Sequence, residues 1–398
     1  MPPLPSRLNA YEQAIVRNAE WFLLNQKQEG NIDVEGDEFY GLRGDATLVG
    51  HSVTVRMYAY GLTRDARYLA SARSSLEWLK RKQDARGGWR GVTAFTLDGA
   101  QCVFEGFNSY ERVTGDASFR SVLVSAARRM IAGTIAQDGR LILPNIIEIG
   151  EYAHFCLLAW KTTGDESFQK AAQNILGHIY GNFDEAEGFW NPYDVHAARL
   201  PVFLSPLKFG LRSLARAFPL RGRMAAKLAS SLLPFVTAPA RPQYSMSLMD
   251  AEALLDTLDG SCSLALLRKQ TECAVEWARI HCKGPFSGSL VESCRVARGA
   301  EVYPLSIIND TRAAALWPTT CWLLALCALN EAKYRDQAAQ IASFVLGAQG
   351  SDGGFYNFRN PDGSFAKLRS GNVNFYASMS LWVYNEVYGT GTLKLFTK

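Results

Sequence analysis

The chain has 398 residues, of which 48% are apolar and 20% charged, and its formal net charge is +4 at pH 7. This balance is typical of a globular protein and excludes disordered and collagen-like chains, while so small a charge gives no indication of nucleic-acid binding. The sequence shows no leader with a basic start and no apolar run of about eighteen residues, so we expect a cytoplasmic protein without a membrane-spanning helix.

An internal repeat dominates the sequence: a glutamine, a glycine four residues later, and a bulky apolar residue two positions further on. The copies recur at roughly fifty to sixty residues, with one wider gap, and each follows an amphipathic stretch. Units of this length bury their apolar faces only against their neighbours. The sequence therefore predicts an all-α fold, a toroid of five or six helical hairpins forming one domain over residues 1–398. The clear copies are Gln26/Gly30/Ile32, Gln83/Gly87/Trp89 and Gln349/Gly353/Phe355, and looser ones lie near 137–141, 182–190 and 284–290.

A second recurring pattern marks the turn inside each hairpin. An apolar stretch stops at a glycine or polar residue, an aspartate follows, and an aromatic residue stands three positions later. Glycine after a helix and aspartate before the next one are expected stop and start signals. The pattern predicts an inner helix, a tight turn and an outer helix, and it occurs at 62–72, 113–123 and 162–172.

The inner helices are predicted from the residues that precede these turns. Long polar loops lead into them, so their positive N-terminal ends should gather at one mouth of the ring. The predicted inner helices are 52–61, 101–113, 149–162, 247–258, 317–330 and 374–388, and the loops before them are 36–51, 95–100, 143–150, 191–199, 301–312 and 357–372.

One segment interrupts the repeat. Residues 195–249 contain no Asp or Glu but many Arg and Lys, interleaved with Leu and Phe. We interpret residues 199–245 as an insertion with one or two basic amphipathic helices between Pro206 and Pro234. Such helices fit three roles: a solvated face packed on the ring, contact with an anionic membrane surface, or attraction of an acidic substrate.

Metal and cofactor signatures are missing from the sequence. The eight cysteines form no CxxC pair, and several stand in apolar helical stretches, where cysteine behaves as a small hydrophobic residue. Phosphate-binding loops, dinucleotide fingerprints and HExxH motifs are also absent. We therefore predict neither a metal site nor a cofactor.

The most specific catalytic candidates are Glu148 and Glu151, three residues apart near a predicted helix start. They would share one face of the helix, and their apolar neighbours could raise the pKa of one carboxyl so that it acts as a general acid. The alternative is that both carboxylates simply favour the positive end of the helix.

Two further groups of candidates stand at the predicted mouth. Asp194 and His196 follow Trp190 and Tyr193, so that an aromatic platform would meet acid and base groups, an arrangement that suits a sugar ring; the alternative is a capping role for the aspartate. His51 opens a predicted inner helix and completes the catalytic candidates together with Asp310, for which an ion pair with a neighbouring arginine is the alternative. The predicted substrate-binding residues are Arg43, Trp190, Tyr193, Arg312, Trp317 and Asn372.

The repeat resembles two branches of the helical toroids. The segment 79–89, LKRKQDARGGW, is similar to the QW motif of terpene cyclases and protein prenyltransferases, and 348–355 nearly so. The cyclase acid motif DxDD is absent, with IINDTRAA at 307 the nearest approach. Residues 374–382 resemble the helix that supplies the zinc-binding histidine of prenyltransferases, but Ala377 stands where that histidine should be.

The other branch is carbohydrate-active: acylglucosamine epimerases, uronyl epimerases and unsaturated glucuronyl hydrolases. Their repeats resemble the segments at 114 and 163, and GGFYNFRNPDGSF at 353–365 is similar to a segment of the acylglucosamine epimerases. This resemblance implies acid/base chemistry on a saccharide, and the many acids, histidines and arginines of the mouth favour an acidic, uronic-type substrate for an epimerase, lyase or hydrolase.

Two other functions stay open. A terpene or prenyl cyclase would use the aromatic residues to stabilise carbocations and the basic insertion to dock on a membrane, which would place the protein at the inner membrane face. A toroid without catalytic activity would bind glycan or protein. The expected partner is a small-molecule or oligosaccharide substrate, with an anionic membrane surface at 199–245 as a further candidate and no nucleic acid.

Overall fold

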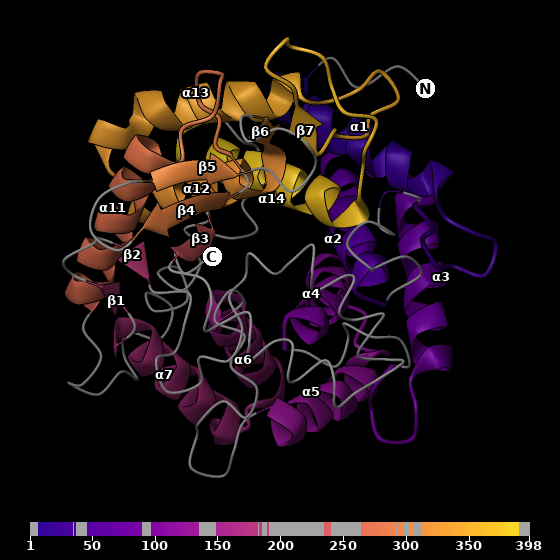
Figure 1. The fold of residues 1–398 in the computed structure, drawn as a ribbon. Coiled ribbons are helices and arrows are strands. Elements are labelled where there is room, and N and C mark those ends of the chain that lie inside the picture. The colour runs from indigo at the N-terminus through magenta and orange to yellow at the C-terminus, as the bar shows by residue number, and fades with distance from the viewer. Residues whose placement is uncertain are drawn as a thin grey trace, which may run out of the picture.

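The computed structural model describes residues 7–34, 36, 46–89, 97–134, 149–181, 183–184, 189–190, 235–239, 264–291, 293–297, 302–305 and 313–389. Up to residue 181, and again from residue 264 on, the described helices alternate along the chain between an outer and an inner layer of a ring (Figure 1). The inner helices are α2 (Ala46–Thr63), α4 (Leu97–Thr114), α6 (Ile149–Thr163), α12 (Leu316–Leu329) and α14 (Gly371–Val387). The outer helices are α1 (Ala10–Leu24), α3 (Ala66–Lys82), α5 (Arg120–Thr134), α7 (Glu166–Gly181), α11 (Leu264–His281) and α13 (Arg335–Gly347), which the short 3₁₀ helix η6 (Ala332–Tyr334) precedes.

The predicted ring of helical hairpins is confirmed. Five predicted inner helices correspond to α2, α4, α6, α12 and α14, and the sixth, 247–258, lies outside the described residues. Four of the five begin earlier than predicted, and α2 extends back to Ala46. His51 is consequently the sixth residue of α2 and not its first.

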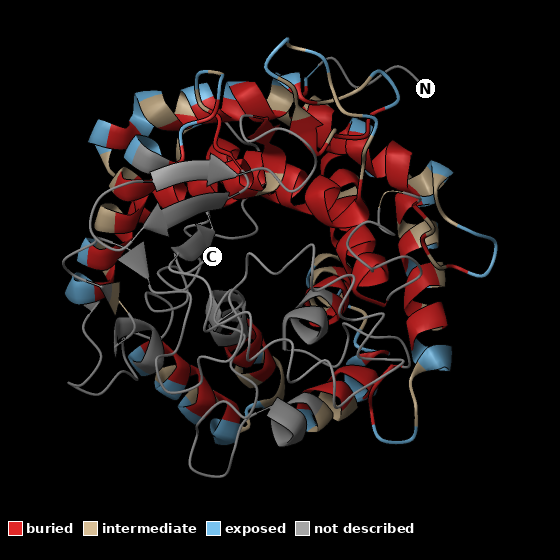
Figure 2. Cartoon of the chain, in the orientation of Figure 1, coloured by how far each residue is buried: buried red, intermediate tan, exposed pale blue. Residues whose placement is uncertain are grey.

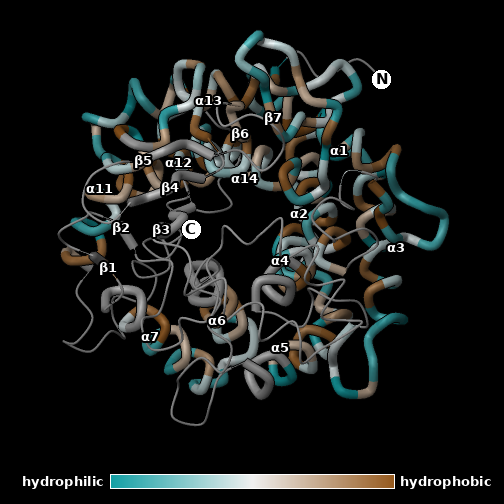
Figure 3. The backbone as a smooth tube through the Cα atoms, in the orientation of Figure 1, coloured by the Kyte–Doolittle hydropathy of each residue, from teal (hydrophilic) through white to brown (hydrophobic). Residues whose placement is uncertain are grey.

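Inner and outer helices differ in burial as their positions require. Every residue of α14 from Gly371 to Asn385 is buried, because this helix packs against outer helices on one side and inner neighbours on the other. Helix α3, in contrast, buries one stripe and exposes a polar face. Figure 2 shows the buried residues within the ring, and Figure 3 places hydrophilic residues along its periphery.

The repeated glutamine joins each hairpin to the next. In all three clear copies its side-chain Nε2 donates to the carbonyl of the repeat glycine and to a carbonyl of the following outer helix. For the third copy the following outer helix is α1, so this contact closes the ring. The bonds run from Gln26 to Gly30 (3.3 Å) and Ser71 (3.0 Å), from Gln83 to Gly87 (3.1 Å) and Val122 (3.0 Å), and from Gln349 to Gly353 (2.9 Å) and Ala14 (2.8 Å).

Amide side chains hold the seam between the first and last hairpins. Asn18 Nδ2 donates to Asn374 Oδ1 over 2.6 Å, and Ser378 Oγ donates to Asn18 Oδ1 over 2.9 Å. Asn9 Nδ2 donates to Asn385 Oδ1 over 3.0 Å. These buried or half-buried side chains satisfy one another's hydrogen-bonding groups. The first and last hairpins therefore fit together in only one relative position along their axes.

A buried arginine ties α2 to α3. Arg56 is fully buried, and its Nη2 donates to Ser52 Oγ over 2.6 Å and to Ser75 Oγ over 2.9 Å. Gln26 Nε2 donates to the same Ser75 hydroxyl, so the repeat turn and the inner helix share one polar network. Burial lowers the pKa of Arg56 to about 9.

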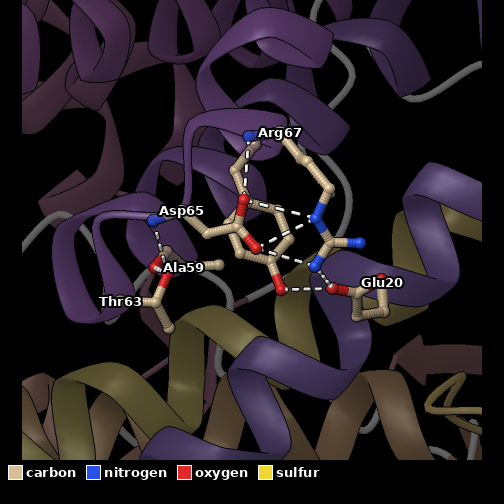
Figure 4. A network of polar contacts seen from close by, with 6 residues as sticks. Glu20, Ala59, Thr63, Asp65 and Arg67 are labelled. Carbon is tan, nitrogen blue, oxygen red and sulfur yellow. Dashed lines mark hydrogen bonds and ion pairs between the residues drawn. The ribbon is translucent and has the colours of Figure 1, made fainter. Parts of the chain in front are cut away.

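The turns inside the hairpins follow the predicted chemistry. A threonine hydroxyl donates to the carbonyl four residues earlier and accepts the N–H of the aspartate two residues later, while the aspartate accepts the backbone N–H two residues further along the chain. Figure 4 shows the first copy, where Arg67 also bonds Asp65 and Glu20. The threonine and aspartate pairs are Thr63/Asp65, Thr114/Asp116 and Thr163/Asp165.

We expect Arg64→Gly to stabilise the protein. The turn needs a left-handed residue at this position: Gly115 and Gly164 supply it with φ of 74° and 70°, whereas Arg64 adopts φ of 60°. An L side chain is strained there, so glycine should add about 0.5–1 kcal/mol to the free energy of unfolding after its own entropic cost. Urea unfolding followed by circular dichroism measures this, and a lower midpoint would contradict the expectation.

Three small sheets accompany the helices: β1 (Phe183–Asp184) with β2 (Phe189–Trp190), β3 (Phe235–Pro239) with β4 (Ser293–Ala297) and β5 (Val302–Leu305), and β6 (Ala314–Ala315) with β7 (Phe358–Arg359). Strand β5 lies in the segment 301–312 that we predicted as a loop. Strand β3 is the described part of the predicted insertion 199–245, and the helices predicted between Pro206 and Pro234 lie outside the described residues.

Of the helices described, none is both long and apolar enough to cross a membrane.

Candidate functional site

The candidate site lies at the N-terminal ends of three neighbouring inner helices, α12, α14 and α2. Their aromatic rings form a connected row. The His51 imidazole stacks on the Phe375 ring with centroids 3.9 Å apart and planes 7° from parallel, and it meets the Tyr376 ring edge-on at 5.8 Å. Tyr376 in turn stacks with Trp317 at 6.0 Å. The structure thus brings two predicted site residues, His51 and Trp317, into one row.

His51 is a fully buried imidazole without a polar partner among the described residues. Its exposed fraction is 0%, and neither Nδ1 nor Nε2 makes a hydrogen bond with a described residue. Burial lowers its pKa to about 3, because the charged form loses its solvation. The ring is therefore neutral near pH 7, with one nitrogen able to donate and one able to accept a hydrogen bond.

This burial predicts a dependence of stability on pH. The folded pKa of about 3 lies below the unfolded value of about 6.5, so below that pH the unfolded chain binds a proton that the folded chain does not. The contribution of neutral His51 to the free energy of unfolding is fully present above pH ~6.5 and is lost as the pH falls toward ~3. Between these values the free energy of unfolding falls by at most about 1.4 kcal/mol per pH unit. Between pH 7 and 5, wild-type protein should lose about 2 kcal/mol more than His51→Phe, measured by urea unfolding. Equal losses would contradict the burial of this group.

The remaining candidate whose side chain the structure describes is Asn372, the second residue of α14. It is buried, and it follows the helix cap Ser370, whose hydroxyl accepts the Val373 N–H. A hydrogen bond from the Ser370 N–H to Asn357 Oδ1, 3.0 Å long, holds the cap residue in place. This capping fixes the first turn of α14, which contains Asn372 and which Phe375 directly follows.

A buried carboxylate that we did not predict lies on the next inner helix. Glu105 of α4 is 3% exposed and stands beside Gly106, where α4 approaches α2 so closely that a Cβ on Gly106 would lie 2.6 Å from the Gly50 carbonyl oxygen. His51 stands beside Gly50. The glycine contact therefore brings the backbones of α2 and α4 together beside these two residues, and the Glu105 carboxylate interacts electrostatically with Tyr58, two turns along α2 from His51.

Most other predicted site residues are not tested by the structure. Glu151 is the third residue of α6 and Trp190 belongs to β2, which places their backbones but not their side chains. The candidates that lie outside the described residues are Arg43, Glu148, Tyr193, Asp194, His196, Asp310 and Arg312. No group of three or more metal-binding side chains is found among the described residues.

Sequence reasoning missed Phe375 and Tyr376. Both lie within NFYASMSLW, a helix whose aromatic and small residues are as expected for a buried inner helix as for a platform. Their position in the first turns of an inner helix, beside the predicted mouth, was the available signal.

Comparison with known proteins confirms the fold. No model of a known protein family matches the chain, and no curated protein matches it in sequence. Among solved structures, cellobiose 2-epimerase from Spirochaeta thermophila superposes with a TM-score of 0.63 at 13% identity, over 97% of this chain and 99% of that one. An unsaturated glucuronyl hydrolase specific for heparin gives 0.61 at 14%, over 95% and 96%. The type II terpene cyclase MstE from Scytonema gives 0.52 at 13%, over 95% and 99%.

These similarities show that the chain has the α/α-toroid fold, as both stated resemblances implied. At such low identities they concern the fold alone, and function has to be argued from the site.

Proposed function

We propose that the chain is a carbohydrate-processing enzyme that moves a proton at a saccharide bound at the N-terminal ends of the inner helices. The observation that carries this proposal is the neutral imidazole of His51, buried among aromatic rings and without a described polar partner. A buried polar group normally has its hydrogen bonds satisfied, and an unsatisfied one costs stability. A bound substrate that forms hydrogen bonds with the His51 imidazole would explain why a polar group occupies this buried position.

The pKa of His51 favours an acidic substrate. A base with a pKa of about 3 holds a proton weakly, whereas general bases work best with a pKa near the operating pH. A carboxylate placed near the ring stabilises the imidazolium and raises the pKa toward that range. A uronic-type saccharide would therefore activate the base that acts on it, and a carbon next to its carboxylate is the natural site of proton abstraction for epimerisation or elimination.

The surroundings of His51 provide the other elements of such a site. Ligand sites are lined mainly by apolar and aromatic side chains with few polar groups, which Trp317, Tyr376 and Asn372 match. The Asn372 amide can both donate to and accept from hydroxyl groups. Glu105 and Glu151 on the next inner helices are the proposed acid partners of His51.

We propose that the remaining predicted residues lie at the same end of the ring. Their functional groups suit recognition of hydroxyl and carboxylate groups, with arginine forks suited to carboxylates. Glu148, Asp194, His196 and Asp310 are proposed to take part in proton transfer, and Arg43, Trp190, Tyr193 and Arg312 are proposed to bind substrate.

A terpene or prenyl cyclase is the second candidate. The aromatic row of Trp317, Tyr376 and Phe375 favours it, since such rings stabilise cations, and the terpene cyclase fold is similar. A neutral imidazole stacked within that row would, however, accept a proton from a carbocation and quench it early.

Solvent deuterium exchange tests the proposal. The protein is incubated in D₂O with uronic-acid oligosaccharides, with neutral reducing disaccharides and with prenyl diphosphates, and products are followed by NMR. We expect deuterium, or a new double bond, at the carbon next to the carboxyl or carbonyl group of a saccharide. Cyclised prenyl products with inert saccharides would replace the proposal by the second candidate.

A further inference from the structure

A basic groove of about 760 Å³ lies on the outer surface, where the turn after α3 meets α5. Four arginines from these two segments line it: Arg86 from the turn and Arg120, Arg128 and Arg129 from α5. Ser121 and Ser125 belong to the same lining.

The repeat chemistry holds the two sides of the groove together. Gln83 Nε2 donates to the Val122 carbonyl over 3.0 Å. Gly87 has a φ of 86° and lies so close to α5 that a Cβ there would be 2.4 Å from the Ser125 carbonyl oxygen. These two contacts with the α5 backbone therefore fix the turn that carries Arg86 next to α5 and its arginines.

The positive charge of the groove is partly compensated: the Asp84 carboxylate interacts electrostatically with Arg129 and Arg86, and the Asp165 carboxylate with Arg128, in each case without a close ion pair. Arg120 pairs with Glu111, but no ion pair joins Arg86, Arg128 or Arg129 to a carboxylate of the described residues. The nearest acid in sequence, Asp84, uses Oδ1 to accept the N–H groups of Arg86 and Gly88 over 2.8 and 3.0 Å. Helix α3 adds further positive charge in its last turn, at Lys80, Arg81 and Lys82.

We propose that this groove binds a chain of anionic sugars, an acidic polysaccharide. Guanidinium groups bind carboxylate and sulfate through two parallel hydrogen bonds, and the serine hydroxyls can bond sugar hydroxyls. Arg120 and Arg129 are nine residues apart on α5, which spans about 13 Å and leaves room for more than one anionic group.

The lining disfavours the other common polyanions. It contains no aromatic side chain, so nucleobases of a single strand would find no stacking surface. A membrane-binding face needs large apolar side chains beside its basic ones. The exposed large apolar residues of the described part are Leu24, Leu266 and Ile280, and none of them lines the groove.

Binding of a fluorescein-labelled polyuronate oligosaccharide to the full chain, followed by fluorescence anisotropy, tests the proposal. The triple variant Arg86→Gln, Arg128→Gln and Arg129→Gln should bind at least about tenfold more weakly and with a shallower dependence on salt. These side chains are exposed or half-exposed, so the far-ultraviolet circular dichroism should not change.

The charge-matched control is Lys161→Gln, Lys170→Gln and Lys269→Gln, three exposed lysines on other helices. This control should bind as wild type does. Unchanged affinity of the arginine variant, equal loss in the lysine variant, or no binding by wild type would each overturn the proposal.

Two further measurements identify the class of ligand and distinguish binding in the groove from binding at the candidate site around His51. Duplex DNA or vesicles of anionic phospholipid that compete better than the polyuronate would overturn the assignment to saccharide. The inference does not depend on the proposed function: His51→Phe should keep groove binding, so a protein that binds polyuronate yet turns over no saccharide would contradict only the proposed function.

Discussion

Gly353→Ala is expected to lower the free energy of unfolding by about 4 kcal/mol, the largest effect on stability of any change considered. Two costs add at this position. The backbone has φ of 94°, which strains a residue that carries a Cβ, and that Cβ would lie 2.1 Å from the carbonyl oxygen of Arg17 on α1. The carbonyl belongs to a helix and cannot move aside without displacing α1 from the seam of the ring.

The matched control for this variant is Gly115→Ala. Gly115 also has a positive φ, 74°, but a Cβ there would meet no atom within 4 Å. It should lower the stability by only about 1–2 kcal/mol, the conformational part of the cost. Urea unfolding of both variants measures the difference, and equal losses would show that the close approach of the seam plays no part.

The repeat shows which features of the fold can be predicted from sequence. The spacing from Gln349 to Gly353 and Phe355 indicates a helical hairpin, because the turn and the capping chemistry are local. The partner of the glutamine is not local: Ala14 lies 335 residues away. A single sequence thus predicts that such turns exist and leaves open which helix each one holds.

The small β-sheet escaped prediction for a related reason. Strand β3 pairs with β4, so that Phe235 lies opposite Ala297, far apart in sequence. The strand FVTAP ends in alanine and proline and lacks the polar–apolar alternation of a half-buried strand, and it follows a segment that we predicted to be helical. Pairing between distant segments, and not local preference, determines this part of the fold.

The candidate site shows the same limit. His51 was identifiable because a histidine stands near the start of a predicted inner helix. Its ring contact with Phe375 joins opposite ends of the chain and follows from ring closure. Glu105 gave no signal, since one carboxylate in an apolar helix is equally typical of a solvated position, and its burial is seen only once α4 packs against α2.

Replacing His51 by phenylalanine separates its proposed catalytic role from a structural one. A proton-transfer group contributes about 10²–10⁴-fold to the rate, so His51→Phe should reduce kcat/KM for the saccharide substrate by that factor. The same change removes an unsatisfied buried polar group at similar volume, and the new ring can still stack on Phe375. The free energy of unfolding at pH 7 should therefore stay constant or rise by about 1 kcal/mol.

Phe375→Leu is the control, since it should lower the stability and largely keep the turnover. It keeps the imidazole but removes its stacking partner, and it leaves a partly filled space in the core. We expect a loss of about 1–3 kcal/mol in stability and less than about a tenfold loss in turnover. If His51 served only the packing of α2 against α14, the two variants would change stability in the same direction and His51→Phe would retain turnover. Measuring kcat/KM and urea midpoints for both proteins distinguishes these cases, because only a catalytic His51 combines a large loss of rate with undiminished stability.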